Sequence, residues 1–325
     1  MADAVLAVLS GTPTDVAAAA INTRPETLAD AVETYQTAGY HALETGVADH
    51  GWYSIRIQFP DWEGAEQAAV TDLGPRLDRL QDLISEWWFI RKHPCWRLRL
   101  RPRSGQVSEV KAAVNRVLND LATSGVLTRW WPAIYEPEVA SFGGAVGTDI
   151  AHTLFCADSR HMLSYLRQPP PEVGRKEMSV LLCTTLQNAA GLDPFERGNL
   201  WTSITELRPF PTSTPASMRE AMAEQIRPLV GSDTASGIWR GPCAFATPWA
   251  AAFRNAGDSL GEAAAAGYLD RGVRHVLTHL IIFHWNRLGL PAATQAILSR
   301  AASEALLPTE TARSAGTVTP TRQRH

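Results

Sequence analysis

The stretch EWWFIRKHPCWRLRLR (residues 86–101) decides the fold, because it contains two β-rich segments, 86–91 and 95–101, separated by three residues. Aromatic and branched side chains at this spacing predict two adjacent strands. Upstream, the alternating stretch WYSIRIQF (52–59) predicts a preceding strand. Downstream, VLTRWWPAIY (126–135) predicts a fourth strand, and the proline near its centre indicates an edge strand or a bulge.

Helical periodicity lies between these strands, at 61–84 and 108–124. The resulting order, β-α-β-β-α-β, is that of a ferredoxin-like split βαβ sheet. After Gly143 and Gly144 the pattern predicts only helices, at 145–167, 176–190, 195–207, 215–230, 248–267, 271–288 and 292–306. We therefore predict an α+β fold with a large helical half.

The two ends of the chain differ from this central part. Residues 1–46 predict a three-helix module, with helices at 2–9, 14–21 and 25–38 punctuated by proline and glycine. The third helix carries three acidic residues and no internal Arg or Lys, so DNA phosphates would repel it, and we expect no DNA binding. The main domain is expected at 51–306. Residues 308–325 are polar, lack aromatics and are expected to form a disordered tail.

Composition excludes several protein classes. The 325 residues are 45% hydrophobic and carry a net charge of −3, which is typical of a globular chain and unlike a strongly basic nucleic-acid binder. The four cysteines are far apart with no CxxC pair, which indicates reduced thiols rather than a zinc site or a disulfide framework. No apolar run is long enough to cross a membrane, so we expect a cytoplasmic protein.

Arg97, Arg99 and Arg101 share one face of their strand, because strand side chains alternate between two faces. Three guanidinium groups on one face repel one another unless negative charge lies opposite. Two interpretations stay open at this point: pairing with acids such as Glu136 and Glu138, or a site for an anion or a peptide carboxylate. Two arginines of neighbouring strands extend the patch: Arg56 and Arg91.

The histidines offer a second candidate site. His284 lies in FHWNRLGL, where His, Asn and Arg interrupt an otherwise apolar helix. Both a buried hydrogen-bonded cluster and a general base beside an arginine fit this pattern. His275 and His279 are one helical turn apart but lack an HExxH motif, so we expect no metal. The phosphate, dinucleotide and serine-hydrolase motifs are absent, so no cofactor is expected.

Four blocks in this order resemble the thiopeptide-type bacteriocin biosynthesis domain, the family of the C-terminal elimination domain of lantibiotic dehydratases. The blocks are WWFIRKHPCWRLRLR (87–101), WWPAIYEPEVASFGG (130–144), GTDIAHTLFCADSRHML (147–163) and HLIIFHWNRLGL (279–290). The resemblance runs from about residue 52 to residue 306.

The resemblance implies an enzyme of antibiotic biosynthesis that acts on a ribosomal precursor peptide with a leader and needs no metal or nucleotide. One branch of the family eliminates glutamate from glutamylated Ser or Thr and leaves a dehydroamino acid. A second branch, the thiopeptide pyridine synthases, joins two dehydroalanines in a formal [4+2] cycloaddition and releases the leader. A third alternative is a non-catalytic, leader-binding partner of a separate glutamylating LanB-like protein. A homodimer is a further open alternative.

For elimination, the resemblance implies that Arg97 or Arg99 holds the glutamyl group and that His284 moves the proton, because this reaction needs a base and fixed cations. Six further residues are expected to contact substrate: Arg101, Arg91, Arg56, Tyr135, Arg287 and Trp88. Two departures favour the cycloaddition: Ser141 and Ile282 stand where the dehydratases have Arg and His. Hydrogen-bond donors for that reaction would be Tyr135, Tyr268, Ser259 and Trp249.

Overall fold

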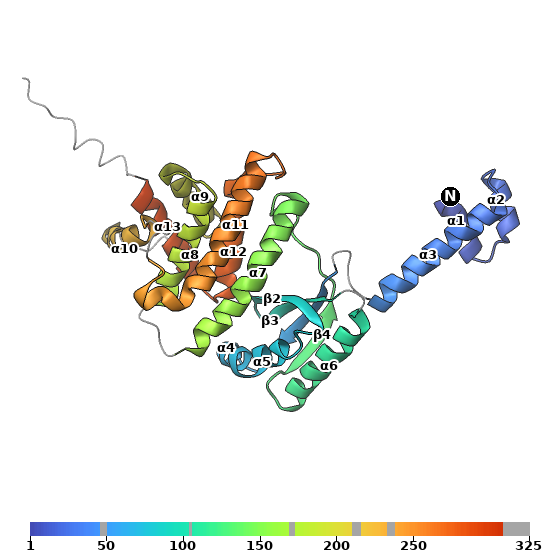
Figure 1. The fold of residues 1–325 in the computed structure, drawn as a ribbon, viewed down its shortest axis with the longest axis horizontal. Helices are drawn as coiled ribbons and strands as arrows, with labels where there is room; N and C mark the ends of the chain where they lie inside the picture. The colour runs from blue at the N-terminus through green and yellow to red at the C-terminus, as the bar shows by residue number, and fades with distance from the viewer. Residues whose placement is uncertain (46–50, 104–105, 169–172, 210–215, 233–237, 308–325) are drawn as a thin grey trace, which may run out of the picture.

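The computed structural model describes residues 1–45, 51–103, 106–168, 173–209, 216–232 and 238–307. It is a mostly helical α+β fold in which helices pack against a four-stranded antiparallel sheet (Figure 1). The predicted tail at 308–325 lies outside the described residues. Within them, no helix combines the length and the apolar character needed to span a bilayer.

The sheet contains β1 (Tyr53–Gln58), β2 (Ile84–Lys92), β3 (Cys95–Pro102) and β4 (Arg129–Ala133), in the spatial order β2-β3-β1-β4. Together with the intervening helices, they give the β-α-β-β-α-β order that the sequence predicts, with every neighbouring pair antiparallel. The edge strand β4 contains Pro132, as expected for a residue that cannot donate to a ladder.

One sheet face packs against α6 (Val107–Thr123), whose Asn115 accepts a 2.8 Å hydrogen bond from Tyr53. The same side includes the segment between β1 and β2, for which the sequence predicts one helix over 61–84. That prediction is wrong in detail. The structure has α4 (Ala65–Ala68), a π-helical turn and α5 (Gly74–Asp78), with Pro75 near the start of α5. The helical residues run without a break from 65 to 78, with the π-helical turn directly before Gly74 and Pro75, and turns at 62–64 and 79–83 replace the two ends of the predicted helix. Pro75 lacks the N–H group that a regular α-helix would use at that position.

The helical half contacts β2, mainly through α7 and α12 (Figure 1), and the described helices largely match the predicted ranges. Its helices are α7 (Gly144–Arg167), α8 (Arg175–Ala189), α9 (Pro194–Leu207), α10 (Ala216–Val230), α11 (Thr247–Ala265), α12 (Val273–Arg287) and α13 (Ala292–Leu306), with a short 3-10 turn, Gly241–Ala246, before α11. α7 follows Gly143, which has φ 76°, a conformation that side chains rarely adopt.

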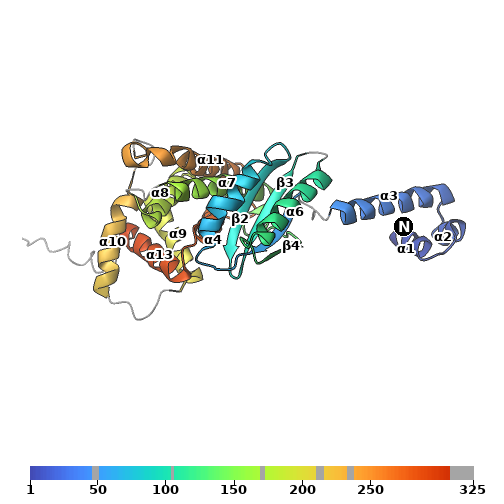
Figure 2. The same cartoon turned by 90° about the horizontal axis from the view of Figure 1, so that it is seen from below.

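The N-terminal module lies at one end of the molecule and consists of α1 (Ala2–Leu9), α2 (Thr14–Ala20) and α3 (Pro25–Thr45) (Figures 1 and 2). It has its own small core, built around Val5, Ala18 and Leu28 and separate from the main core. The predicted end of the third helix at residue 38 is wrong. The helix continues through Gly39, since one glycine inside a helix costs only about 1 kcal/mol.

Candidate functional site

A cationic cavity of about 280 Å³ lies where β2 and β3 meet the end of α9 and one side of α12. Its walls hold five cationic side chains and one carboxylate, together with apolar and amide groups. The lining residues are Ile90, Arg91, Lys92, Arg97, Arg99, Glu138, Arg208, Phe283 and Asn286. The structure therefore places Arg97 and Arg99, the central candidates of the sequence, at one cavity.

Arg99 is the most buried guanidinium of this cavity, at 7% exposure. It lies between two aromatic rings, 4.4 Å from the centroid of Trp88 and 4.6 Å from that of Tyr135. Burial lowers its pKa to about 10, an effect that nearby Tyr135 opposes and Arg97 reinforces. The group therefore keeps its positive charge at neutral pH, in a poorly hydrated setting where electrostatic attraction is strong.

Neither Arg97 nor Arg99 has a carboxylate within ion-pair distance among the described residues; the one hydrogen bond that Arg99 donates goes to the carbonyl of Arg97, at 3.3 Å. Glu138, one of the acids considered as a partner from sequence, is exposed and shares the cavity without forming such a pair. Buried charges are normally paired. Two cations without a carboxylate partner at a cavity fit an anion-binding site.

The other arginines of the predicted patch lie differently. Arg101 forms a 2.8 Å ion pair with Glu86 on β2. Arg91 lies opposite Trp96 in the ladder, on the sheet face away from Arg97, and its guanidinium is ion-paired with Glu66. Arg91 contributes to the cavity wall, but its guanidinium is already held by a carboxylate, which it shares with Arg175.

Arg56 extends the patch on the correct face. Its cross-strand neighbours are Arg97 on β3 and Trp131 on β4, and its side chain is exposed. The cavity lining does not include it. Of the predicted arginine row, the structure therefore brings together Arg97 and Arg99, with Arg56 adjoining on the exposed sheet face.

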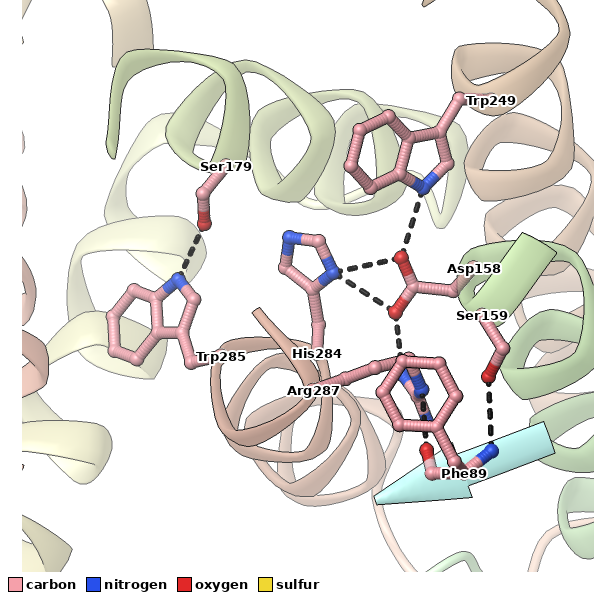
Figure 3. Close-up of polar contacts among 8 residues, drawn as sticks. All are labelled: Phe89, Asp158, Ser159, Ser179, Trp249, His284, Trp285 and Arg287. Atoms are coloured by element: carbon pink, nitrogen blue, oxygen red, sulfur yellow. Dashed lines mark hydrogen bonds and ion pairs between the residues drawn. The ribbon is translucent and has the colours of Figure 1, made fainter. Parts of the chain in front are cut away.

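His284 belongs to a buried polar network centred on Asp158 of α7 (Figure 3). Its Nδ1 donates to both carboxylate oxygens of Asp158, at 3.0 and 2.9 Å, so this nitrogen carries a proton. Trp249 donates to the same carboxylate at 2.8 Å, and Arg287 forms a close ion pair with it. Asp158, His284 and Arg287 are each at most 1% exposed.

Burial alone would raise the pKa of Asp158, but the attraction of His284 and Arg287 outweighs it and lowers this pKa. The carboxylate accordingly stays ionised, which keeps Arg287 neutralised inside the protein.

The network also connects the helical half to the sheet. Phe89 is on the edge strand β2, whose outward backbone groups lack a strand partner. Its carbonyl accepts from Arg287 Nε at 2.9 Å, and its N–H donates to Ser159 Oγ at 3.1 Å (Figure 3). On the same turn of α12, Trp285 donates to Ser179 of α8 at 2.6 Å. These contacts fix α12, and with it the cavity wall formed by Phe283 and Asn286.

His284 and Arg287 therefore lie beside the cavity without lining it. Phe283 and Asn286, on the same helix, face the cavity, whereas the His284 ring packs 4.9 Å from Phe253 of α11. The surroundings of His284 are those of a buried hydrogen-bonded cluster, which is the first of the two interpretations that the sequence leaves open.

Tyr135 and Trp88 also lie behind the cavity, at 3% and 1% exposure. A 2.6 Å hydrogen bond joins Tyr135 Oη to Nε2 of His152, on α7. Burial raises the pKa of Tyr135, which Arg99 partly offsets, so the phenol keeps its proton. Both rings contact the guanidinium of Arg99 and support it from behind.

The donors considered for cycloaddition are dispersed. Tyr268 is 66% exposed, Trp249 is bonded to Asp158, and Ser259 lines a separate cavity of about 330 Å³ between α7 and α11. Ser141 and Ile282, the two departures from the dehydratase pattern, are not among the residues that line the cavity of Arg97 and Arg99.

Sequence reasoning missed Asp158 and Arg208. Asp158 falls within the block 147–163, where its one signal is a charge on an otherwise buried helix face. Arg208 ends α9, directly before Pro209, and no local pattern marks it. Its place at the cavity depends on how α9 packs against distant elements.

A family model described as "Lantibiotic biosynthesis dehydratase C-term" matches residues 52–306. Among solved structures, the tRNA-dependent lantibiotic dehydratase MibB from Microbispora sp. 107891 has 18% identity and a TM-score of 0.58, over 79% of this chain and 28% of that chain. This chain thus spans less than a third of the MibB chain. No curated protein matches the sequence.

Two further structures are similar over nearly their whole length. TsrL has 18% identity and a TM-score of 0.56, over 78% of this chain and 93% of that chain. TbtD, a pyridine synthase from thiomuracin biosynthesis, has 13% identity and a TM-score of 0.56, over 79% of this chain and 97% of that chain. At these identities, the three likenesses show a shared fold.

Proposed function

The chain belongs to the lantibiotic biosynthesis dehydratase C-terminal family, and on this premise we propose that it eliminates glutamate from glutamylated Ser or Thr in a ribosomal precursor peptide. The observation that carries the proposal is the cavity in which Arg97 and Arg99 have no carboxylate partner among the described residues and one carboxylate, Glu138, is close by. Elimination needs this combination of anion-binding groups and a base.

In this proposal Arg99 binds the side-chain carboxylate of the glutamyl group, with Arg97 beside it. Guanidinium groups suit carboxylates because they donate two parallel hydrogen bonds. Trp88 and Tyr135 hold the Arg99 guanidinium in place, which reduces the entropy that Arg99 loses on binding. The bound group presents its ester to the rest of the cavity.

We assign the proton transfer to Glu138, whose carboxylate is the basic group among the residues that line this cavity. Glu138 takes the Cα proton of the modified Ser or Thr. The electron pair of the broken C–H bond forms the Cα=Cβ double bond, and the Cβ–O bond breaks, so that glutamate leaves with the oxygen as a carboxylate. His284, bonded to Asp158, acts in this scheme as a positioning residue for α12.

Mass spectrometry of a synthetic leader-containing peptide with one glutamylated serine tests the proposal. Incubation is expected to remove glutamate and leave dehydroalanine, and the variant Glu138→Gln is expected to leave the peptide unchanged. If the wild-type protein binds the peptide and its mass stays the same, elimination is refuted and a leader-binding role is favoured.

A second candidate is the cycloaddition of two dehydroalanines with release of the leader. Ser141 and Ile282 favour it, because they replace an arginine and a histidine of the dehydratase pattern. A peptide that already contains two dehydroalanines distinguishes the reactions: cycloaddition converts it to a ring product and a free leader, whereas elimination leaves it intact.

A further inference from the structure

Arg208 lines the cavity from the end of α9, a different element from β3, which carries Arg97 and Arg99. It is the C-cap of α9, and its side chain is held on two sides. Nε donates to Oε1 of Gln295 at 2.9 Å, and Nη1 donates to the carbonyl of Leu207 at 3.0 Å. These two bonds fix the orientation of a half-buried guanidinium at the cavity.

Gln295 is itself oriented, because it is 2% exposed and its amide nitrogen makes two hydrogen bonds. Nε2 donates to Oδ1 of Asn286 at 3.0 Å and to the carbonyl of Leu290 at 2.8 Å. With its N–H groups used in this way, Gln295 presents its oxygen to Arg208. A chain of three side chains from α12, α13 and α9 therefore places Arg208, and its two end members line the cavity.

The cavity thus has guanidinium groups on two separate walls. Arg97 and Arg99 project from β3, and Arg208 projects from the end of α9, while Arg91 is already ion-paired with Glu66. One ligand carboxylate satisfies the pair on β3. A third guanidinium, that of Arg208 on another element of the lining, remains available for a second anionic group on the same ligand.

Resting on the proposed elimination, we propose that Arg208 binds the carboxylate that appears on the departing glutamate, while Arg97 and Arg99 hold its side-chain carboxylate. When the Cβ–O bond breaks, its electron pair stays on the glutamyl oxygen, so the ester becomes a carboxylate. A donor aimed at charge that develops in this way stabilises the transition state more than the bound substrate. The site is then specific for leaving groups that depart as dicarboxylates.

Calorimetric titration with glutarate and butyrate tests this inference, because the two acids differ in the number of carboxylates. The wild-type protein is expected to bind glutarate more tightly than butyrate. Arg208→Gln is expected to weaken glutarate binding by about tenfold or more, the usual size of a lost charged hydrogen bond, and to leave butyrate binding unchanged. Arg208→Lys, which keeps the charge, is expected to bind glutarate with an affinity between those of the wild type and Arg208→Gln. Arg79→Gln, on an exposed turn, is the matched control.

Gln295→Met tests the positioning role, and the expected result is weaker glutarate binding with butyrate binding retained. If Arg208→Gln binds glutarate as the wild type does, or if the wild type binds the two acids equally or not at all, the inference is overturned. Arg99→Gln separates the two proposals. If Arg99→Gln binds neither acid while Arg208→Gln binds both normally, only the inference about Arg208 is overturned. If Arg99→Gln binds both acids as the wild type does, the cavity is not the carboxylate site, and the proposed function is overturned as well.

Discussion

Replacing Asp158 by asparagine tests the buried network that fixes α12. The carboxylate accepts hydrogen bonds from His284, Trp249 and Arg287, and it is the counter-ion of the buried Arg287 guanidinium. Asparagine has nearly the same shape but no charge, and its amide N–H groups would face donors. The substitution therefore leaves a buried cation without its counter-ion and leaves hydrogen bonds unmade, while the packing volume stays almost constant.

The expected loss in free energy of unfolding is large. Breaking a buried ion pair by removing one partner costs about 3–5 kcal/mol, and folded domains have a total free energy of unfolding of only about 5–15 kcal/mol. The loss also depends on pH. The pKa of Asp158 is lowered in the folded protein, so its stabilisation is present above the unfolded value of about 3.9 and disappears as the pH falls through the folded value. The difference in free energy of unfolding between the wild type and Asp158→Asn should therefore become smaller in strong acid.

Urea denaturation at pH 7, monitored by tryptophan fluorescence, measures this free energy. Asp149→Asn is the matched control, because Asp149 is exposed on the same helix and its substitution should change stability by no more than about 0.5 kcal/mol. A loss for Asp158→Asn below about 1 kcal/mol, or one equal to that of the control, would refute the reasoning.

The other predictions concern the cavity. Glu138→Gln should abolish glutamate release, measured by mass spectrometry, while the protein still binds the glutamylated peptide. His284→Gln should reduce glutamate release less than Glu138→Gln does, and it should lower the free energy of unfolding measured by urea denaturation. Arg99→Gln should weaken glutarate binding by about tenfold or more in calorimetry. Because the pKa of Arg99 is lowered to about 10, carboxylate affinity should fall as the pH rises through that value, earlier than for an ordinary arginine. Full affinity at still higher pH would show that Arg99 is not the binding cation.

Much of the fold could be predicted because its signals are local. The alternation in 95–101 places Arg97 and Arg99 on one face of β3, and the structure has them there. The amphipathic spacing over 61–84 predicts one helix, whereas the helical residues run from 65 to 78 and include a π-helical turn. Gly39 predicts a helix end, but a single glycine is a weak stop signal and the helix continues to Thr45.

The site was harder to predict because its contacts join residues far apart in sequence. Arg101 forms an ion pair with Glu86 through the register of β2 and β3, which shifts near Ile84 and has no sequence signature. Asp158 meets His284 across 126 positions, so its role appears only once α7 and α12 are packed. Arg208 reaches the cavity through Gln295, an amide that no motif distinguishes.

The most direct test of the proposed elimination uses a glutamylated serine that carries deuterium at Cα, incubated with the wild-type protein. Elimination predicts that glutamate is released together with loss of that deuterium, that the peptide product is dehydroalanine, and that release is slower than from the protiated peptide. Release of glutamate with a serine product that retains its deuterium would mean ester hydrolysis, and it would contradict the account.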